Sequence, residues 1–205
     1  MQALNQNRYQ IVLASSSVFR KKLMSNLNLD FITNSPDIDE SPRPNELPWE
    51  LSSRLSKEKA LAVKQKLYNN TDNQKNNYII IGSDQVAICK NKIYGKPLNY
   101  EKAVKYLKII SGNTVYFYTG LAVINTKLNT IEQKLNITEV KFRAFSEKTI
   151  ENYIEKTQPF YSTLAIKAEE LGITLIESIY SKDPNALIGL PLIDLSEILI
   201  NFKIL

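Results

Sequence analysis

Asp84 is the first candidate for chemistry, because it follows the continuously apolar run from Tyr78 to Ile81. Such a run is typical of a strand covered on both faces. In open α/β sheets, ligands gather beyond the carboxyl ends of the strands. The position therefore favours a functional carboxylate, although an aspartate that caps a turn explains the residue equally well.

Lys59 is the second candidate, because helical winding places it on an apolar stripe between Leu55 and Val63. A lysine on such a stripe either extends its charged end to water or reaches an anion. Lys66 falls in the same arc. The other basic residues of this helix fall on the opposite arc and are expected to be solvated: Arg54, Lys57 and Lys64.

A third feature joins Ser15-Ser16-Ser17 to the basic run Arg20-Lys21-Lys22 at the predicted start of a helix. Hydroxyls, free backbone amides and a positive helix terminus together could bind a triphosphate. A serine cap beside an ordinary basic surface is the alternative that this stretch alone favours.

Lys96 and an acidic pair complete the candidates. Lys96 precedes Pro97, so a rigid turn presents its side chain, unless it is simply a surface lysine. Asp39 and Glu40 offer the oxygen ligands that magnesium prefers, unless they belong to a solvated acidic loop.

The composition restricts the chemistry further. The chain contains no histidine, which excludes serine–histidine–aspartate and cysteine–histidine machinery and histidine-ligated metals. Phosphorus chemistry with a hard metal ion stays open. The one cysteine, Cys89, suits a reducing compartment, and no apolar segment is long enough for a membrane span, so a cytoplasmic location is expected.

The elements that must position these residues alternate between strands and helices. Strands are expected at 9–14, near Phe31, at 78–81 and at 172–179, with hairpins over 86–93 and 114–142 and a polar loop at 69–77. Helices are expected at 18–27, 49–67, 100–110, from 146, and from Pro191 to about 202. This order predicts an α/β fold on a mixed, twisted sheet flanked by helices, within one globular unit spanning residues 1–205.

These features follow one another in an order that resembles the Maf family of nucleotide pyrophosphatases. The matching stretches cover nearly the whole chain: Leu13-Ala14-Ser15 to Arg20, Asp39-Glu40, Lys59-Ala60, Ile81 to Gln85, Gly95-Lys96-Pro97, Ser111-Gly112, Tyr118-Thr119-Gly120, Lys167-Ala168-Glu169, Gly172-Ile173-Thr174, Asp183-Pro184-Asn185 and Gly189-Leu190-Pro191.

The resemblance implies a fold with two lobes around a central cleft, similar to Maf and inosine triphosphatase proteins, and a homodimer. It also implies hydrolysis of a nucleoside triphosphate to the monophosphate and pyrophosphate with a divalent cation, magnesium or manganese. Asp84 would accept the proton of the attacking water, and Glu40 and Asp84 would hold the metal. The substrate phosphates would lie against the remaining residues of the motif: Ser15, Arg20, Lys59 and Lys96.

Three further positions resemble the branch of the family that acts on 7-methyl-GTP: Phe19, Gln85 and Glu169. A methylated guanine carries positive charge that favours an aromatic face, and a carboxylate can accept hydrogen bonds from guanine's N1 and N2. Phe19 also fits core packing with Leu23 and Leu27. The chain departs from the branch at Val18, Phe19, Lys21, Leu164, Ala165 and Glu170.

Other functions stay open on the sequence alone. The base could be a pyrimidine or another purine, and a non-enzymatic regulator of septum formation is conceivable from the origin of the family's name. The net charge of +5 suggests a nucleic-acid partner only weakly, because the basic residues are not interleaved with aromatic ones. We therefore expect a small-molecule nucleotide, with no nucleic acid or membrane partner.

Overall fold

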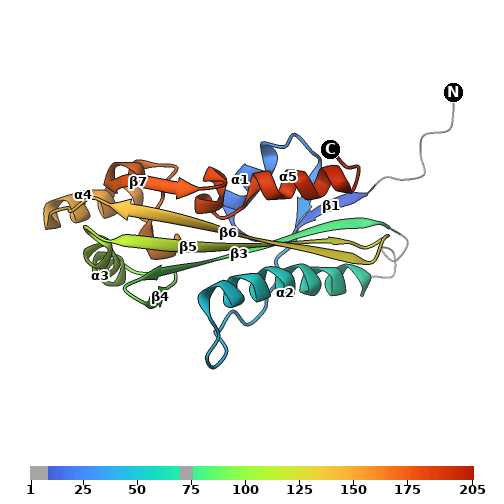
Figure 1. Ribbon diagram of the computed structural model, residues 1–205, viewed down its shortest axis with the longest axis horizontal. Helices are drawn as coiled ribbons and strands as arrows, with labels where there is room; N and C mark the ends of the chain where they lie inside the picture. The colour runs from blue at the N-terminus through green and yellow to red at the C-terminus, as the bar shows by residue number, and fades with distance from the viewer. Residues whose placement is uncertain (1–8, 70–75) are drawn as a thin grey trace.

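The computed structural model describes residues 9–69 and 76–205. In this part of the chain, seven strands form one mixed sheet in the order β2-β1-β3-β5-β6-β7, with β4 paired to β3 (Figure 1). The predicted mixed sheet is confirmed. The strands are β1 (Gln10–Leu13), β2 (Phe31–Thr33), β3 (Tyr78–Cys89), β4 (Lys92–Tyr94), β5 (Thr114–Asn125), β6 (Thr130–Phe142) and β7 (Ile176–Ser181).

Helices cover both faces of this sheet. Figure 1 shows α2 on one side of the central strands and α5 on the other, while α3 and α4 lie at the far end. The described helices are α1 (Val18–Ser25), α2 (Pro48–Tyr68), α3 (Tyr100–Ile110), α4 (Glu147–Thr157) and α5 (Leu192–Asn201), with short 3₁₀ turns η2 (Thr163–Ala165), η3 (Leu171–Leu175) and η4 (Pro184–Ile188).

The apolar run that opens β3 divides its side chains between two cores. Ile79 and Ile81 pack in a cluster with β1, α1 and α5, whereas Tyr78 and Ile80 pack in a cluster with α2. Successive side chains of a strand point to opposite faces, so an uninterrupted apolar run is what a strand covered on both faces requires.

β3 is longer than the sequence predicts, and the expectation that Asp84 follows the end of the strand is wrong. The strand runs on to Cys89, and Asp84 pairs with Gly120 of β5 in its middle. A charged residue is tolerated there because Lys59 of α2 supplies a partner for its carboxylate.

Two glycines bring α2 close to the sheet at this point. A methyl group on Gly82 would lie 2.2 Å from the backbone oxygen of Ser56, and one on Gly120 would lie 2.3 Å from that of Ser52. No side chain fits in either place. The approach of α2 to the middle of β3 and β5 therefore requires glycine at both positions.

The bounds of the remaining expected helices and strands are confirmed within a few residues, with one exception. The strand expected at 172–179 begins only at Ile176 as β7, because Leu171–Leu175 forms a 3₁₀ turn. The tight approach of Gly172 to the backbone of Lys167 explains why this segment turns.

Most of the polar loop expected at 69–77 lies outside the described residues. Among the described helices, none combines the length and apolar character of a membrane span.

Candidate active site

A cavity of about 380 Å³ opens where β1, α1, α2, β3 and the turns η2 and η4 meet. It brings together residues that lie far apart in the sequence. The predicted site residues that line it are Ser15, Phe19, Arg20, Glu40, Lys59, Gln85, Lys96 and Glu169. Asp84 is the one predicted site residue outside this lining, and it joins the site through Lys59.

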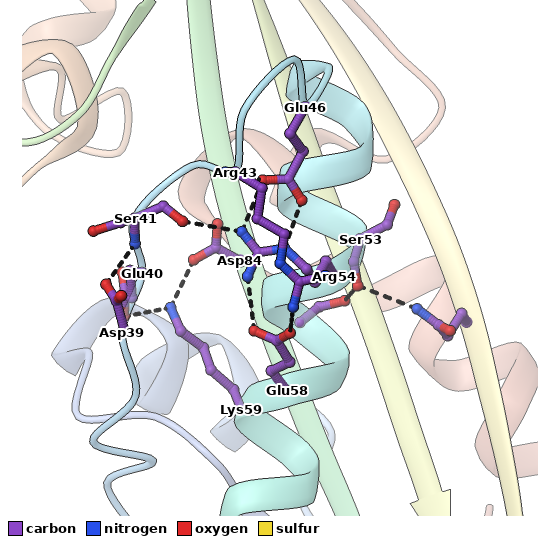
Figure 2. Close-up of polar contacts among 12 residues, drawn as sticks. Asp39, Glu40, Ser41, Arg43, Glu46, Ser53, Arg54, Glu58, Lys59 and Asp84 are labelled. Atoms are coloured by element: carbon purple, nitrogen blue, oxygen red, sulfur yellow. Dashed lines mark hydrogen bonds and ion pairs between the residues drawn. The ribbon is translucent and has the colours of Figure 1, made fainter.

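Lys59 links two carboxylates from different parts of the fold (Figure 2). Its Nζ atom lies 2.6 Å from Asp84 Oδ1 and 2.8 Å from Glu40 Oε1. The side chains of Lys59 and Asp84 are buried, whereas that of Glu40 is 54% exposed. Of the two alternatives for a lysine on the apolar stripe, contact with anions is therefore the one observed.

The charges around Glu40 keep it ionised. Burial opposes its ionisation, but the hydrogen bond and charge of Lys59 outweigh that effect, so the pKa of Glu40 is lowered. The charges of Lys96 and Arg20 act in the same direction. Three cations thus converge on one carboxylate at the cavity wall.

Arg20 is held against the cavity by the backbone of the turn after η4. Its Nε donates to the carbonyl oxygen of Gly189 at 2.8 Å. Burial lowers the pKa of Arg20, while the charges of Asp84 and Glu40 raise it. An arginine stays protonated under such opposing effects, so it can neutralise an anion in the cavity.

The serine loop caps α1 and also lines the cavity. Ser17 is the N-cap residue, and its hydroxyl accepts from the backbone N–H of Arg20 at 3.4 Å. Ser15 is buried, and its hydroxyl accepts from the backbone N–H of Ser17 at 3.1 Å. The serine cap is therefore observed, and it faces a cavity rather than open solvent; the binding of a triphosphate by this loop stays a prediction.

Apolar side chains also line the cavity. Phe19 lines it together with Val18, Ile166 and Leu187. Glu169 also lines the cavity; the residue is exposed, but partial desolvation of its carboxyl group raises the pKa of that group. Lys167 Nζ lies 6.0 Å from the centre of the Phe19 ring, within the range of a cation–π contact.

Gln85 is tied to the fold by its side-chain amide. Its Nε2 donates to the carbonyl oxygens of Ala186 at 2.9 Å and Leu187 at 3.0 Å, and contacts Thr119 Oγ1 at 3.2 Å. These bonds hold η4 against β3. Gln85 therefore helps to shape the cavity wall that Leu187 and Ile188 provide.

Two residues that the structure brings to the site are not singled out by sequence reasoning. Ser83 donates to the carbonyl oxygens of Gly120 and Gly189, which anchors the turn that holds Arg20. Tyr161 lines the cavity from the loop before η2 and is 74% exposed. Ser83 stands beside Asp84 in the motif, but no sequence signal marks Tyr161.

Glu40 and Asp84 are the residues that could hold a metal ion. Within the described part of the chain, no three side chains of histidine, cysteine, aspartate or glutamate converge as a complete ligand set. A pair of carboxylates fits magnesium or manganese, which take hard oxygen ligands and retain waters or substrate phosphates in their shells. The ammonium group of Lys59 between them shows that this position favours positive charge.

A family model described as Maf-like protein matches residues 10–202. The chain belongs to the Maf family. Three relatives bear the name 7-methyl-GTP pyrophosphatase. The protein of Aliivibrio fischeri is 46% identical over 190 residues, which is 93% of this chain and 94% of its own. That of Vibrio parahaemolyticus is 44% identical over 191 residues, with the same coverage. That of Hydrogenovibrio crunogenus is 46% identical over 190 residues, covering 93% and 91%.

This Maf chain adopts an unusual backbone conformation where it departs from the branch pattern. Leu164 and Ala165 are buried and have φ angles of 55° and 59°. Side chains other than glycine rarely take this left-handed conformation. The turn is supported by Tyr153, whose hydroxyl donates to the carbonyl oxygen of Ala165 at 2.9 Å. Glu170, another departure, pairs with Lys167 at 3.3 Å.

Proposed function

We propose that this chain hydrolyses 7-methyl-GTP to 7-methyl-GMP and pyrophosphate. The observation that carries the proposal is the convergence of Arg20, Lys59 and Lys96 with Glu40 and Asp84 at one cavity, in a member of the Maf family. Three cations suit a triphosphate, and two carboxylates suit a metal and an attacking water. The names of the relatives support the choice of nucleotide.

In the proposed reaction, water attacks the α-phosphorus of the triphosphate. A new P–O bond forms, the bond to the β-phosphate oxygen breaks, and pyrophosphate leaves with the electron pair of that bond. Asp84 takes the proton of the water, because an ionised carboxylate can accept it at neutral pH. Arg20, Lys59 and Lys96 neutralise the phosphates and the charge that develops on the leaving group.

A divalent cation held by Glu40 and Asp84 would supply charge for phosphate neutralisation and would lower the pKa of water. The residues of the chain have their own tasks. Lys59 holds both carboxylates beside one ammonium group, and Ser15 and the N-terminus of α1 offer donors to phosphate oxygens. The proposed site thus divides charge neutralisation from proton transfer.

Phe19 and Glu169, which both line the cavity, would bind the base. The ring of Phe19 would stack on the methylated guanine, and the carboxylate of Glu169 would accept from its N1 and N2 donors. One observation favours a second candidate. Lys167 already places a positive charge over the Phe19 ring, which disfavours a cationic base and favours an unmethylated purine triphosphate.

A panel of nucleotides decides between these substrates. Pyrophosphate release is measured with 7-methyl-GTP, GTP, ATP, dTTP and UTP, each with magnesium and with manganese. We expect the highest kcat/KM for 7-methyl-GTP. A best rate with GTP would support the second candidate, and a best rate with dTTP or UTP would contradict both.

Three further predictions from the resemblance accompany the proposal. We propose a single unit with two lobes around the cavity, a homodimer and a cytoplasmic location. The continuous sheet supports the first of these, since β3 and β5 contribute residues both to the cluster packed with α1 and α5 and to another cluster packed with α3 and α4. The dimer and the location stay predictions. Light scattering of the purified protein tests the dimer directly.

A further inference from the structure

Arg54 is the most heavily bonded cation of α2, although the sequence places it on the solvated arc. Its side chain is only 14% exposed. Nε and Nη2 bind the two oxygens of Glu46 at 2.5 Å and 2.8 Å, and Nη1 binds Glu58 Oε2 at 2.8 Å. The expectation that Arg54 is merely solvated is therefore wrong.

A fourth bond connects Arg54 to the backbone of the acidic loop. Its Nη2 donates to the carbonyl oxygen of Ser41 at 3.1 Å (Figure 2). The fixed planar fork of a guanidinium can make all four bonds at once, whereas an ammonium group cannot span them. Arg54 thus joins α2 to both ends of the segment 41–46.

Arg43 closes a second link between the same partners. Its Nη2 binds Glu58 Oε1 at 2.9 Å, and its backbone N–H donates to Glu46 Oε2 at 2.9 Å. We call the four residues Arg43, Glu46, Arg54 and Glu58 the arginine clamp. Each carboxylate of the clamp contacts both arginines, so the clamp is a closed ring of charge-assisted bonds.

Side-chain contacts, more than backbone pairing, hold the loop at 35–47: besides the clamp, Lys66 binds Asp37 and the Ser35 carbonyl, and Lys59 binds Glu40. The loop contains three prolines, and within 35–47 of the described chain the only backbone-to-backbone hydrogen bond joins Glu46 N–H to the Arg43 carbonyl. Glu40 immediately precedes Ser41, the residue bonded to Arg54. The clamp on one side of α2 and Lys59 on the other therefore fix the segment that carries Glu40.

We propose that Arg54 is a positioning residue, which holds the loop on α2 so that the Glu40 carboxylate stays beside Lys59 and Asp84. Arg54 acts through the backbone of Ser41 and through Glu46, and it touches neither Glu40 nor the cavity lining. The expected effect of Arg54 on catalysis rests on the proposed function, in which Glu40 holds the metal. The expected effect of Arg54 on the order of the loop is independent of that function.

The test compares Arg54→Met with Lys57→Met. Lys57 lies on the same helix, is exposed, and has no ion pair with another described residue. Hydrogen–deuterium exchange is followed in peptides covering 38–47. We expect faster exchange in this segment for Arg54→Met, with the exchange of β3 and β5 unchanged, and no change in either place for Lys57→Met.

Turnover supplies the second readout. A general structural defect would not raise the metal requirement while leaving KM for the nucleotide unchanged. With 7-methyl-GTP and increasing manganese, Arg54→Met should need about 10–100-fold more metal for half-maximal rate, as for other residues that orient a metal ligand. KM for the nucleotide should change little, since the phosphates contact other residues. Lys57→Met should behave as the wild type.

Arg54→Lys keeps the positive charge and serves if the methionine variant does not fold. It should show the same two effects to a smaller extent, because one ammonium cannot reach Ser41, Glu46 and Glu58 together. Unchanged exchange in 38–47 and an unchanged requirement for manganese would overturn the proposal. A wild-type protein that is inert toward every nucleotide would overturn the proposed function. Hydrogen–deuterium exchange needs no substrate, so it would still decide whether Arg54 holds the loop.

Discussion

Lys59 Nζ stands 2.6 Å from Asp84 Oδ1, so a lysine from the helix α2 and an aspartate from the middle of strand β3 form a buried ion pair. The same nitrogen reaches Glu40 of the acidic loop at 2.8 Å. Removing one member of a buried pair leaves the other charge uncompensated. The pair therefore couples the chemistry of the site to the packing of α2 on the sheet.

Asp84→Asn is expected to lower kcat for pyrophosphate release by about 10²–10⁴-fold, because the amide cannot accept the proton of the attacking water. The size of the side chain is unchanged, so the cavity should keep its shape. Turnover of 7-methyl-GTP at saturating manganese measures the effect. Asp30→Asn is the control, since Asp30 is exposed and is not among the residues that line the cavity, and it should retain full activity. Equal activity of the wild type and Asp84→Asn would refute the assigned role.

Gly82→Ala is expected to destabilise the protein by about 1–3 kcal/mol, the usual cost of forcing a methyl group into packed structure. The new methyl would lie 2.2 Å from the Ser56 carbonyl oxygen and 2.9 Å from the Ala60 nitrogen. Since these atoms belong to the backbone of α2, relief requires the helix to move, and Lys59 moves with it. Both the melting temperature and the turnover should fall.

Gly95→Ala provides the matched control for stability. No atom lies within 4 Å of the methyl group that this substitution would add. Calorimetry should therefore find its melting temperature close to that of the wild type. If the two variants melted at the same temperature, the close approach of α2 to β3 would not be the reason for glycine at position 82.

The sequence predicts those parts of the fold that depend on local periodicity. The helix expected at 100–110 is observed as Tyr100–Ile110, and the long hairpin begins at Thr114 and ends at Phe142. In both, the apolar residues repeat at the period of a helix or of a strand, and polar residues typical of caps and turns mark the ends. Asn99 caps the helix by accepting from the backbone N–H of Lys102.

The parts that the sequence does not predict depend on partners far along the chain. β3 continues past Gly82 because α2 covers the glycine and Lys59 binds Asp84, and neither contact can be read from the residues around position 84. Helical spacing alone predicts that Arg54 is solvated. Its burial depends on Glu46 and Ser41, which precede the helix and reach it only through the fold of the loop.

The candidate site shows the same division. The order of the motifs predicts which residues gather at the cavity, and all but Asp84 line it. Periodicity alone could not separate a core role from a site role for Phe19, because a residue at the edge of α1 can contact both. Tyr161 stands in an irregular loop, where no repeating pattern indicates the direction of a side chain.

Leu98→Gly is expected to stabilise the protein by about 0.5–1 kcal/mol. Leu98 has a φ angle of 67°, a left-handed conformation that costs a residue with a side chain about 1–2 kcal/mol. Its side chain is 60% exposed, so truncation loses little apolar burial. The greater freedom of glycine in the unfolded chain offsets part of the gain. Urea denaturation measures the difference.

Leu128→Gly is the matched control for this prediction. Leu128 is similarly exposed, at 56%, but its φ angle is not positive. The same substitution should there destabilise the protein by about 0.5–1 kcal/mol, because only the entropy of the unfolded chain changes. Effects of the same sign in both variants would show that backbone strain at Leu98 is not the cause.

Glu46 should make the stability of the protein depend on acid pH. The hydrogen bond from Arg54 lowers its pKa to about 2, against the opposing effect of burial. The pKa of a glutamate in the unfolded chain is about 4.3. Because the folded state binds this proton less readily, Glu46 stabilises the fold fully above about pH 5, and the contribution is lost as the pH falls from about 4.3 towards 2.

Comparison with Glu46→Gln isolates this contribution from the other carboxylates that titrate in the same range. The difference in unfolding free energy between wild type and variant should be constant from pH 7 to about pH 5 and should shrink as the pH falls further. Urea denaturation at intervals down to pH 2.5 measures it. Glu132→Gln, at an exposed position of β6, is the control variant measured in the same series. A difference for Glu46→Gln that did not vary with pH would show that Arg54 does not hold Glu46 as an ion pair, and the arginine clamp would lose its central contact.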